Sequence, residues 1–424
     1  MNDADKANEY AMQLTQDESD MLAGRRGKSV RRAIEQQIEV GKFFGAKRFV
    51  PVTNVHMMGD IEVMGNAGLR FLREMRADHV SCVRPTTTNA RCIDFAHAEE
   101  LHQDAQEVQK EHEIVDCLRH MNITTVDTCI NYQTTYQPHF GEHVAWGDTG
   151  TVIYANSVFG ARSNFESGPA AFAASLTGRT PAYGFHLEEH RRGTLLVEVS
   201  ARLDDLADWG ALGKIVGEPN QDYFAVPVFT GIETTPTSDQ LKQLGCSLAS
   251  YGSMAMYHMV GVTPEAPTVR AALSERQTIT TMRVNDADIE SVYRRYDTGD
   301  GLVSLVVFSG PQLSLLEMKA LAAMFRGRRA HPNTKVFATT SHAILAEARR
   351  LGFAQILEAS GVTILQGVCF YLLQRLSEIR KENGWVNLVS NSAKIVNTIT
   401  AHRFKTILRR TEECVDIAVR GRLS

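Results

Sequence analysis

Residues 123–186, ITTVDTCINYQTTYQPHFGEHVAWGDTGTVIYANSVFGARSNFESGPAAFAASLTGRTPAYGFH, form the stretch around which the rest of the chain is organised. The stretch opens with β-branched residues at 123–126, which predict a short strand, and Cys129 follows where that strand ends. A polar, aromatic loop comes next, and an apolar run at 151–158 leads out of it. Because α/β proteins place their chemistry outside the carboxyl ends of strands, this stretch predicts a functional site.

The remainder of the chain alternates strand and helix patterns. We expect strands at 79–83, 195–201, 223–229, 277–284, 302–308, 334–339 and 362–366, and helices at 238–261, 286–296, 314–326 and 341–351. A basic helix is expected over 402–420. This βα rhythm predicts an α/β fold with mostly parallel sheets flanked by helices.

Domain boundaries are weakly marked, because the chain has no internal repeat, low-complexity tract or Pro/Gly-rich linker. We predict a flexible arm over 1–14 and an α/β region over 15–230 that carries the central stretch. A second α/β region is expected over 231–330, and a C-terminal α/β region over 331–424.

The composition excludes several classes of protein. A net charge of −4 gives no electrostatic basis for binding nucleic acid. No apolar run approaches the ~20 residues of a membrane helix, and the polar, acidic N-terminus is neither a signal peptide nor a transit peptide. Seven widely spaced cysteines without a CxxC pair argue against a disulfide framework and a zinc ribbon. We therefore expect a cytoplasmic enzyme with neither nucleic acid nor membrane as a partner.

Two cysteines, Cys129 and Cys369, follow predicted strands and would converge on one cleft in a multi-strand α/β body. Thiolates at such a place could bind a transition metal or an iron–sulfur cluster. A hydrolytic alternative uses Cys129 as nucleophile, with His139 or His143 as its base. Periodicity and composition do not choose between these alternatives. His56 also lies just past a predicted strand, where a capping or core role competes with a catalytic one.

A further set of polar side chains suits the recognition of a carboxylate: Arg162, Asn164, Asn391, Ser392 and Lys394. Arginine offers a bidentate fork, asparagine and serine supply neutral hydrogen bonds, and lysine adds a point charge. The alternative is a structural hydrogen-bond network at a domain junction. Neither a GxGxxG fingerprint nor a GxxxxGK[ST] loop is present to support a nucleotide cofactor.

With these residues in view, the chain resembles the large subunit of aconitase X, the hydro-lyase branch of the aconitase superfamily. The resemblance covers nearly the whole chain, and its motifs follow the family's order. They are LTQDESDMLAGRRG at 14–27, the strand with His56, the segments at 128–132, 141–146, 154–164 and 176–186, HMVGVTPEA at 258–266 and SNSAK at 390–394.

The resemblance implies an aconitase-like, multi-domain fold with three α/β domains around a cleft and a separate swivelling domain. In some members that domain is fused at the C-terminus, and in others it is a small partner protein. This chain ends soon after SNSAK, so the swivel domain is expected to be absent from it. A small swivel-domain subunit is therefore implied as a partner, and the superfamily's catalytic serine base would lie there.

Family activities are dehydrations, either of cis-3-hydroxy-L-proline to Δ1-pyrroline-2-carboxylate or of mevalonate 5-phosphate. An iron–sulfur cluster held by three cysteines serves as the Lewis acid. Two of these cysteines match Cys129 and Cys369. The third belongs to a GCPH-x-S segment that reads SGPQLS at 309–314, with Gly310 in place of cysteine and Gln312 in place of histidine. A standard three-cysteine cluster therefore lacks one ligand.

Two other segments also depart from the family pattern. The family's GARTNRE has Phe165 in place of its second arginine, which would weaken the binding of an anionic substrate. WSES reads WGDT at 146–149.

On this basis we expect a hydro-lyase that dehydrates a small hydroxy acid or hydroxy amino acid, in particular cis-3-hydroxy-L-proline. Cys129 and Cys369 would hold the metal, as a degenerate cluster or a mononuclear centre. The substrate would be bound by Asn131, Arg162, Ser163, Asn164 and Asn391, and the catalytic residues would be His56, Ser392 and Lys394. The alternative is a divergent paralogue without a cluster, acting as a metal-independent lyase or isomerase or as a non-catalytic binding subunit.

Overall fold

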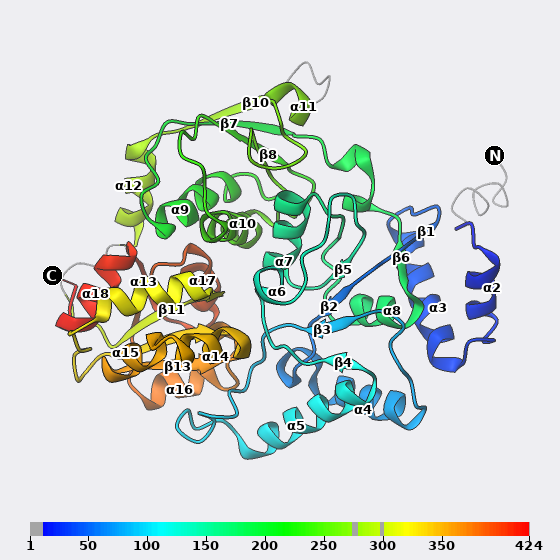
Figure 1. Ribbon diagram of the computed structural model, residues 1–424, viewed down its shortest axis with the longest axis horizontal. Helices are drawn as coiled ribbons and strands as arrows, with labels where there is room; N and C mark the ends of the chain where they lie inside the picture. Colours follow the sequence, from blue (N-terminus) through cyan, green and yellow to red (C-terminus); the bar gives the residue numbers. More distant parts are fainter. Residues whose placement is uncertain (1–11, 274–278, 297–300, 424) are drawn as a thin grey trace.

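The computed structural model describes residues 12–273, 279–296 and 301–423, and its chain forms three α/β groups around a common centre (Figure 1). Residues 1–11 of the predicted arm lie outside the described residues. At the start of the described chain, Thr15 caps helix α2 (Gln16–Leu22) through a capping box with Glu18. The seven-residue helix α2 is followed by α3 (Lys28–Phe43).

The first group is built on a parallel sheet with strand order β4-β3-β2-β5. Its strands are β2 (Val55–Met57), β3 (Thr86–Thr88), β4 (Ile123–Thr124) and β5 (Ala145–Trp146). A small antiparallel pair joins β1 (Phe49–Pro51) to β6 (Arg179–Pro181). The helical segments are α4 (Ile61–Ala77), α5 (Ala105–His120), α6 (Asn131–Thr134), α7 (Thr149–Tyr154), η1 (Ala155–Phe159), α8 (Pro169–Thr177), η2 (Gly184–His186) and η3 (Glu188–His190).

The second group has a parallel sheet of order β10-β7-β8-β9. Its strands are β7 (Leu195–Val199), β8 (Pro227–Thr230), β9 (His258–Met259) and β10 (Thr280–Val284). Its helices are α9 (Leu206–Gly217), α10 (Ser238–Gly252), α11 (Val269–Leu273) and α12 (Asp286–Arg295). Helices α9 and α10 pack closely, because a β-carbon on Gly217 would lie only 3.0 Å from the backbone nitrogen of Gly252.

The third group has a parallel five-stranded sheet of order β13-β12-β11-β14-β15. Its strands are β11 (Leu305–Leu313), β12 (Lys335–Thr340), β13 (Val362–Gln366), β14 (Asn387–Ser390) and β15 (Lys405–Leu408). Its helical segments are α13 (Leu315–Phe325), α14 (His342–Arg350), α15 (Phe353–Ala359), η4 (Phe370–Leu372), α16 (Leu376–Glu382), α17 (Ala393–Thr398), η5 (Ile399–His402) and α18 (Thr411–Arg420). Every residue of β11 is buried, as expected for a central parallel strand.

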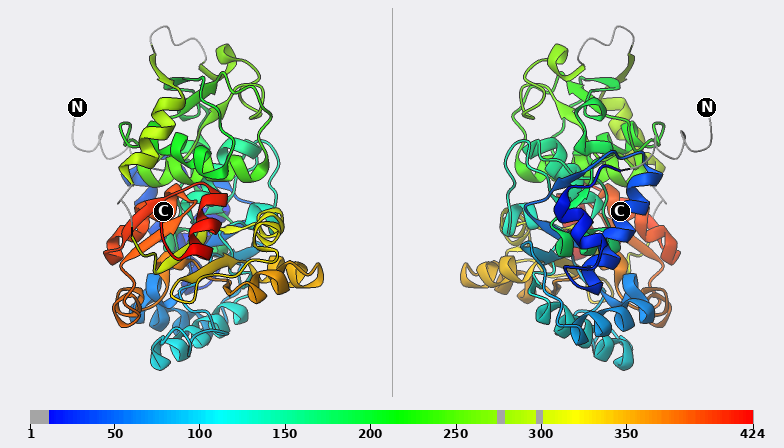
Figure 2. Two further views of the ribbon diagram at one scale, coloured as in Figure 1. Left: turned by 90° about the vertical axis from the view of Figure 1, so that its left-hand side faces the viewer. Right: turned by 90° about the vertical axis from the view of Figure 1, so that its right-hand side faces the viewer.

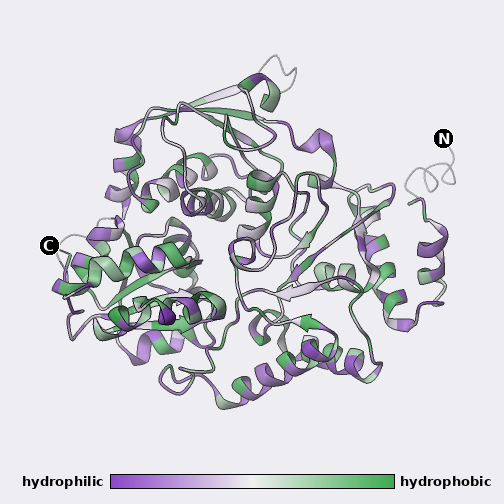
Figure 3. Cartoon of the chain, in the orientation of Figure 1, coloured by the Kyte–Doolittle hydropathy of each residue, from purple (hydrophilic) through white to green (hydrophobic). Residues whose placement is uncertain are grey.

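A shared apolar core joins the three groups. It contains Tyr132 from the first, Trp209 from the second, and Leu365 and Phe370 from the third. Seen from the side, the second group and helix α5 lie at opposite ends, with the C-terminal segments between them (Figure 2). Apolar residues concentrate in strands such as β11, while outer helices such as α5 are mostly polar (Figure 3). Among the described residues, every helix is too short or too polar to span a bilayer.

The predicted fold class, an α/β body with mostly parallel sheets flanked by helices, is confirmed. Three local predictions are wrong. Residues 79–83 form no strand, and the helix expected over 238–261 ends at Gly252, where Ser253 turns into the left-handed region (φ 56°). The basic helix expected over 402–420 is divided, because residues 405–408 pair with β14 as strand β15 before α18 begins.

Candidate active site

The site lies where loops from the first and third groups meet. Arg91, in the loop after β3, pairs with Val368: its N–H donates to the Gly367 carbonyl at 2.8 Å, and its own carbonyl accepts from Cys369 at 3.0 Å. Beside this junction runs the loop after β4, which carries Cys129. Carboxyl ends of parallel strands from separate sheets are thereby brought to one place, which is where α/β proteins bind ligands.

The two thiols predicted to converge do share one environment. Cys129 is 5% exposed and Cys369 is 7% exposed. Burial raises the pKa of Cys129 to about 11, and Asp148 raises it further, while Lys394 opposes the shift. Burial also raises the pKa of Cys369, with Cys129 as the second cause. Both residues are therefore neutral thiols at physiological pH.

A buried lysine and a buried aspartate both lie close to the backbone of Gly150 in α7, and no described ion pair joins them. A β-carbon on Gly150 would lie 2.8 Å from the Cys246 sulfur, 3.1 Å from Asp148 Oδ2 and 3.7 Å from Lys394 Nζ. Asp148 caps α7, because its Oδ2 accepts from the N–H of Gly150 at 2.8 Å. Burial alone would lower the pKa of Lys394, but Asp148 and Cys246 raise it overall. Lys394 is therefore a charged ammonium inside the site.

His56, on β2, is fully buried and faces this site with one nitrogen unpartnered. Its Nδ1 lies 2.8 Å from the hydroxyl of Thr87, which in turn donates to the carbonyl of Val55 at 3.4 Å. Nδ1 is therefore assigned as the protonated nitrogen, and Nε2 has no hydrogen-bond partner within the described chain. Burial lowers the pKa of His56 to about 4, against the influence of Asp148. The imidazole is therefore neutral, with Nε2 as an acceptor.

More unpartnered polar atoms gather in the same region. In the described part of the molecule, both amide atoms of Asn131, the hydroxyl of Tyr132 and Oδ1 of Asn89 are buried and lack a hydrogen-bond partner. Asn131 lies two residues after Cys129, and Asn89 Nδ2 lies 3.5 Å from Asp148 Oδ1. Each unsatisfied buried group costs about 1–3 kcal/mol, so such a cluster indicates groups that await a ligand.

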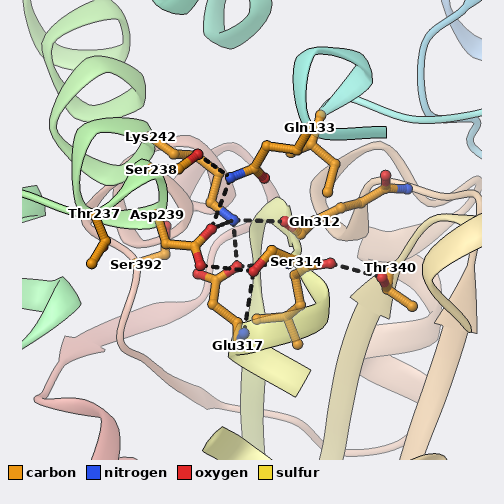
Figure 4. Close-up of polar contacts among 12 residues, drawn as sticks. Gln133, Thr237, Ser238, Asp239, Lys242, Gln312, Ser314, Glu317, Thr340 and Ser392 are labelled. Atoms are coloured by element: carbon orange, nitrogen blue, oxygen red, sulfur yellow. Dashed lines mark hydrogen bonds and ion pairs between the residues drawn. The ribbon is translucent and has the colours of Figure 1, made fainter. Parts of the chain in front are cut away.

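A buried charged network lies beside the segment that contains Gln312. Lys242 on α10 is fully buried and pairs with Glu317 and, at 3.1 Å, with Asp239 (Figure 4). Its Nζ also donates to the Gln312 carbonyl at 3.3 Å. Ser314, the N-cap of α13, donates its hydroxyl to Asp239 at 2.8 Å. The network thereby ties the second group to the loop that follows Gly310.

Three residues predicted to bind substrate instead use their polar groups in hydrogen bonds and ion pairs within the protein. Arg162 donates to the His186 carbonyl at 3.1 Å and to Glu188 at 2.6 Å. Ser163 bonds to backbone on both sides, and both amide atoms of Asn164 are used by the 183–185 turn. Among the described contacts, no hydrogen bond or ion pair joins these three to the thiols or to Lys394. Their role in binding stays a prediction.

Within the SNSAK segment, Asn391 and Ser392 also form hydrogen bonds within the protein, whereas Lys394 belongs to the site. Asn391 donates to the Thr411 hydroxyl at 3.0 Å. Ser392 caps α17 by accepting from Ile395 N–H at 3.3 Å, and its hydroxyl donates to the Gly310 carbonyl. These contacts give Ser392 a structural task, and its catalytic role stays a prediction. Lys394 differs, because its charge lowers the pKa of both Cys129 and Cys369.

The hydrolytic alternative finds no base in the described contacts. His139 is largely exposed and lies beside Glu142. His143 pairs with His186, Nδ1 to Nδ1, at 2.9 Å. Neither histidine has a described contact with Cys129.

A cluster held by three thiolates does not fit these residues. Gly310 has no side chain to donate, and its backbone lies in the left-handed region (φ 67°). A β-carbon there would lie 3.0 Å from the side chain of Ile395. Across residues 12–273, 279–296 and 301–423, no three His, Cys, Asp or Glu side chains are placed to hold one metal ion together.

Comparison with known proteins assigns the chain to a protein family. The family models described as aconitase X first domain, second domain and third domain match residues 11–189, 193–294 and 303–420. The chain belongs to the aconitase X family. The crystal structure of Thermococcus kodakaraensis aconitase X in its holo-form has a TM-score of 0.85 and 30% identity, covering 96% of this chain and all of that one.

Relatives by sequence are dehydratases. The phosphomevalonate dehydratase large subunit of Thermococcus kodakarensis is 32% identical over 385 residues, which cover 90% of this chain and 94% of that protein. The cis-3-hydroxy-L-proline dehydratase of Pseudomonas aeruginosa is 31% identical over 412 residues, 95% of this chain and 69% of that protein. The chain is accordingly a lyase of the aconitase X dehydratase family.

Proposed function

We propose that this aconitase X chain is the large subunit of a hydro-lyase that dehydrates cis-3-hydroxy-L-proline to Δ1-pyrroline-2-carboxylate. The observation that carries the substrate choice is the opposed pair of charges at Gly150, Asp148 and Lys394. A cyclic amino acid brings one carboxylate and one ammonium, which match an ammonium and a carboxylate on the protein. Cys129 and Cys369 lie within electrostatic reach of both charges, since Asp148 raises and Lys394 lowers the pKa of each thiol.

A phosphorylated hydroxy acid fits the same charges less well. Mevalonate 5-phosphate carries a carboxylate and a phosphate, which call for several cations and no anion. Here Asp148 faces the site, Arg162 is paired with Glu188, and Phe165 stands where the family pattern has a second arginine. The charge balance therefore favours the zwitterion, although the relatives include phosphomevalonate dehydratases.

The roles of the side chains follow from their charges. Lys394 binds the carboxylate and stabilises the negative charge that grows there as the α-proton leaves. Asp148 binds the ring ammonium, and Asn131 supplies its unpaired amide atoms. Nε2 of His56 accepts a hydrogen bond from the 3-hydroxyl and orients it. As the C3–O bond breaks, the leaving hydroxide takes up the proton that the base has removed from the α-carbon and departs as water. Together these groups form one face of the reaction site.

A base for the α-proton is expected on a second protein. We propose a small swivel-domain subunit as its source, since relatives of this chain are named large subunits. The described residues leave the thiol site buried on this chain, with Asp148 8% exposed. The partner would complete the site from the side on which Asp148 and Cys369 retain their small exposure.

A cluster-free version of the same enzyme is the second candidate. It is favoured by Gly310, which offers no ligand, and by the full use of the Gln312 side chain in protein hydrogen bonds. In this version Cys129 and Cys369 remain thiols and the Lys394 ammonium is the cation of the site.

One experiment tests both candidates. The chain is purified without oxygen together with a small swivel-domain protein encoded in the same genome, and iron content and visible spectrum are recorded. Consumption of cis-3-hydroxy-L-proline and of mevalonate 5-phosphate is followed by NMR. Turnover of the hydroxyproline without stoichiometric iron supports the cluster-free enzyme. Turnover of the phosphate alone rejects the proposed substrate.

A further inference from the structure

The Gln312 side chain lies between the two thiol-bearing loops and uses all of its bonding groups on them. Gln312 is 1% exposed. Its Nε2 donates to the carbonyl of Asp127 and to that of Val368, both at 3.2 Å. Its Oε1 accepts from the hydroxyl of Thr128 at 2.8 Å. Asp127 and Thr128 directly precede Cys129, and Val368 directly precedes Cys369.

The backbone of Gln312 continues the same arrangement. Its N–H donates to the Cys129 sulfur at 3.3 Å, and its carbonyl accepts from Lys242 at 3.3 Å. Asp127 sits in the left-handed region (φ 53°), a conformation that a non-glycine residue keeps only when its surroundings hold it there. One residue therefore contacts both thiol loops and one thiol sulfur.

We propose that Gln312 is the positioning residue of the two-thiol site. Its side chain links the Cys129 loop to the Cys369 loop by hydrogen bonds, in a segment where residue 310 offers no side chain. Gln312 acts through these loops and does not touch the reacting atoms. Its effect on turnover rests on the proposed function, whereas its effect on the thiols can be measured without any substrate.

The test is the alkylation of each cysteine in the full-length folded chain, read by peptide mass spectrometry across a pH series with iodoacetamide. Gln312→Met keeps the length of the side chain and removes its three hydrogen bonds. We expect alkylation of Cys129 and Cys369 to speed up together by about tenfold or more, the worth of one or two net hydrogen bonds.

Gln37→Met is the matched control. Gln37 is also buried, donates to the Arg179 carbonyl at 2.6 Å and accepts from the Thr177 hydroxyl at 2.9 Å, in the first group. It should leave the alkylation rates of Cys129 and Cys369 within twofold of wild type. Equal acceleration in both variants, or none in Gln312→Met, would overturn the proposal.

Thr128→Val provides a milder variant in case Gln312→Met fails to fold. It removes the hydroxyl that donates to Gln312 and leaves the two carbonyl bonds of that side chain in place. We expect Cys129 alkylation to rise severalfold while Cys369 stays within twofold of wild type. Unchanged alkylation of Cys129 in this variant would also overturn the proposal.

Discussion

Replacing Lys242 by methionine should cost this protein much more stability than replacing another buried lysine. Lys242 has no exposed surface, and its partners Glu317 and Asp239 are 5% and 12% exposed. Methionine fills the aliphatic volume but leaves two buried carboxylates without their cation. Breaking a buried ion pair from one side costs about 3–5 kcal/mol, because the remaining charge is neither hydrated nor paired.

Lys214 on α9 is the matched control. Its side chain is 6% exposed, but its partner Glu218 is 45% exposed and remains hydrated after Lys214→Met. We expect a loss of about 1 kcal/mol, the usual worth of a pair with one exposed member. In Lys242→Met, replacing Glu317 by glutamine as well should recover part of the loss, since it removes one of the two uncompensated charges.

Urea unfolding followed by tryptophan fluorescence measures these differences, because Trp209 is buried on α9 against α10. The expected order of stability is wild type, then Lys214→Met, then Lys242→Met. A loss for Lys242→Met below about 1 kcal/mol, or equal to that of Lys214→Met, would refute the reasoning that the Lys242 network is a desolvated charge cluster.

Three further predictions concern the site. The pKa of His56 is about 4 in the folded protein and about 6.5 in the unfolded chain, so the unfolded state binds more protons between these pH values. The free energy of unfolding should therefore fall by up to about 3 kcal/mol as the pH drops from 6.5 to 4. His56→Gln should flatten that part of a pH–stability curve. Asn131→Leu should raise the melting temperature by removing unpaired buried amide atoms, yet weaken substrate binding in calorimetry; a lowered melting temperature would contradict this. Cys129→Ser should lower kcat in the NMR assay, and full activity would remove Cys129 from the mechanism.

Much of the fold could be predicted from alternating patterns. The sequence predicts strand β13 at its observed bounds, because residues 362–366 are mostly β-branched or apolar and glycines lie on either side of them. Strand β15 was missed, since its four residues lie in a basic segment and gain their conformation by pairing with β14. The helix α10 was extended too far, because residues 253–257 are apolar enough to continue it but turn at Ser253.

The candidate site was predicted in part, for a physical reason. Cys129 and Cys369 lie in loops that follow strands, and Lys394 lies in the first turn of α17 after β14, so their convergence follows from the sheet topology. Cys246 lies within α10, where no sequence motif distinguishes it from an ordinary buried cysteine. The packing of α10 on α7 brings it to Gly150. Arg162 has the right chemistry, but its pairing with Glu188 depends on a turn that no local pattern indicates.

The central claim is that the Asp148–Lys394 charge pair holds the substrate of a dehydratase. The most direct measurement is the kcat/KM for cis-3-hydroxy-L-proline of the complete two-subunit enzyme, compared between wild type, Lys394→Met and Lys214→Met. We predict a loss of about tenfold to a hundredfold for Lys394→Met, the worth of a charge-assisted hydrogen bond of about 1.5–3 kcal/mol, and no loss for Lys214→Met. Wild-type kcat/KM in Lys394→Met would contradict the account.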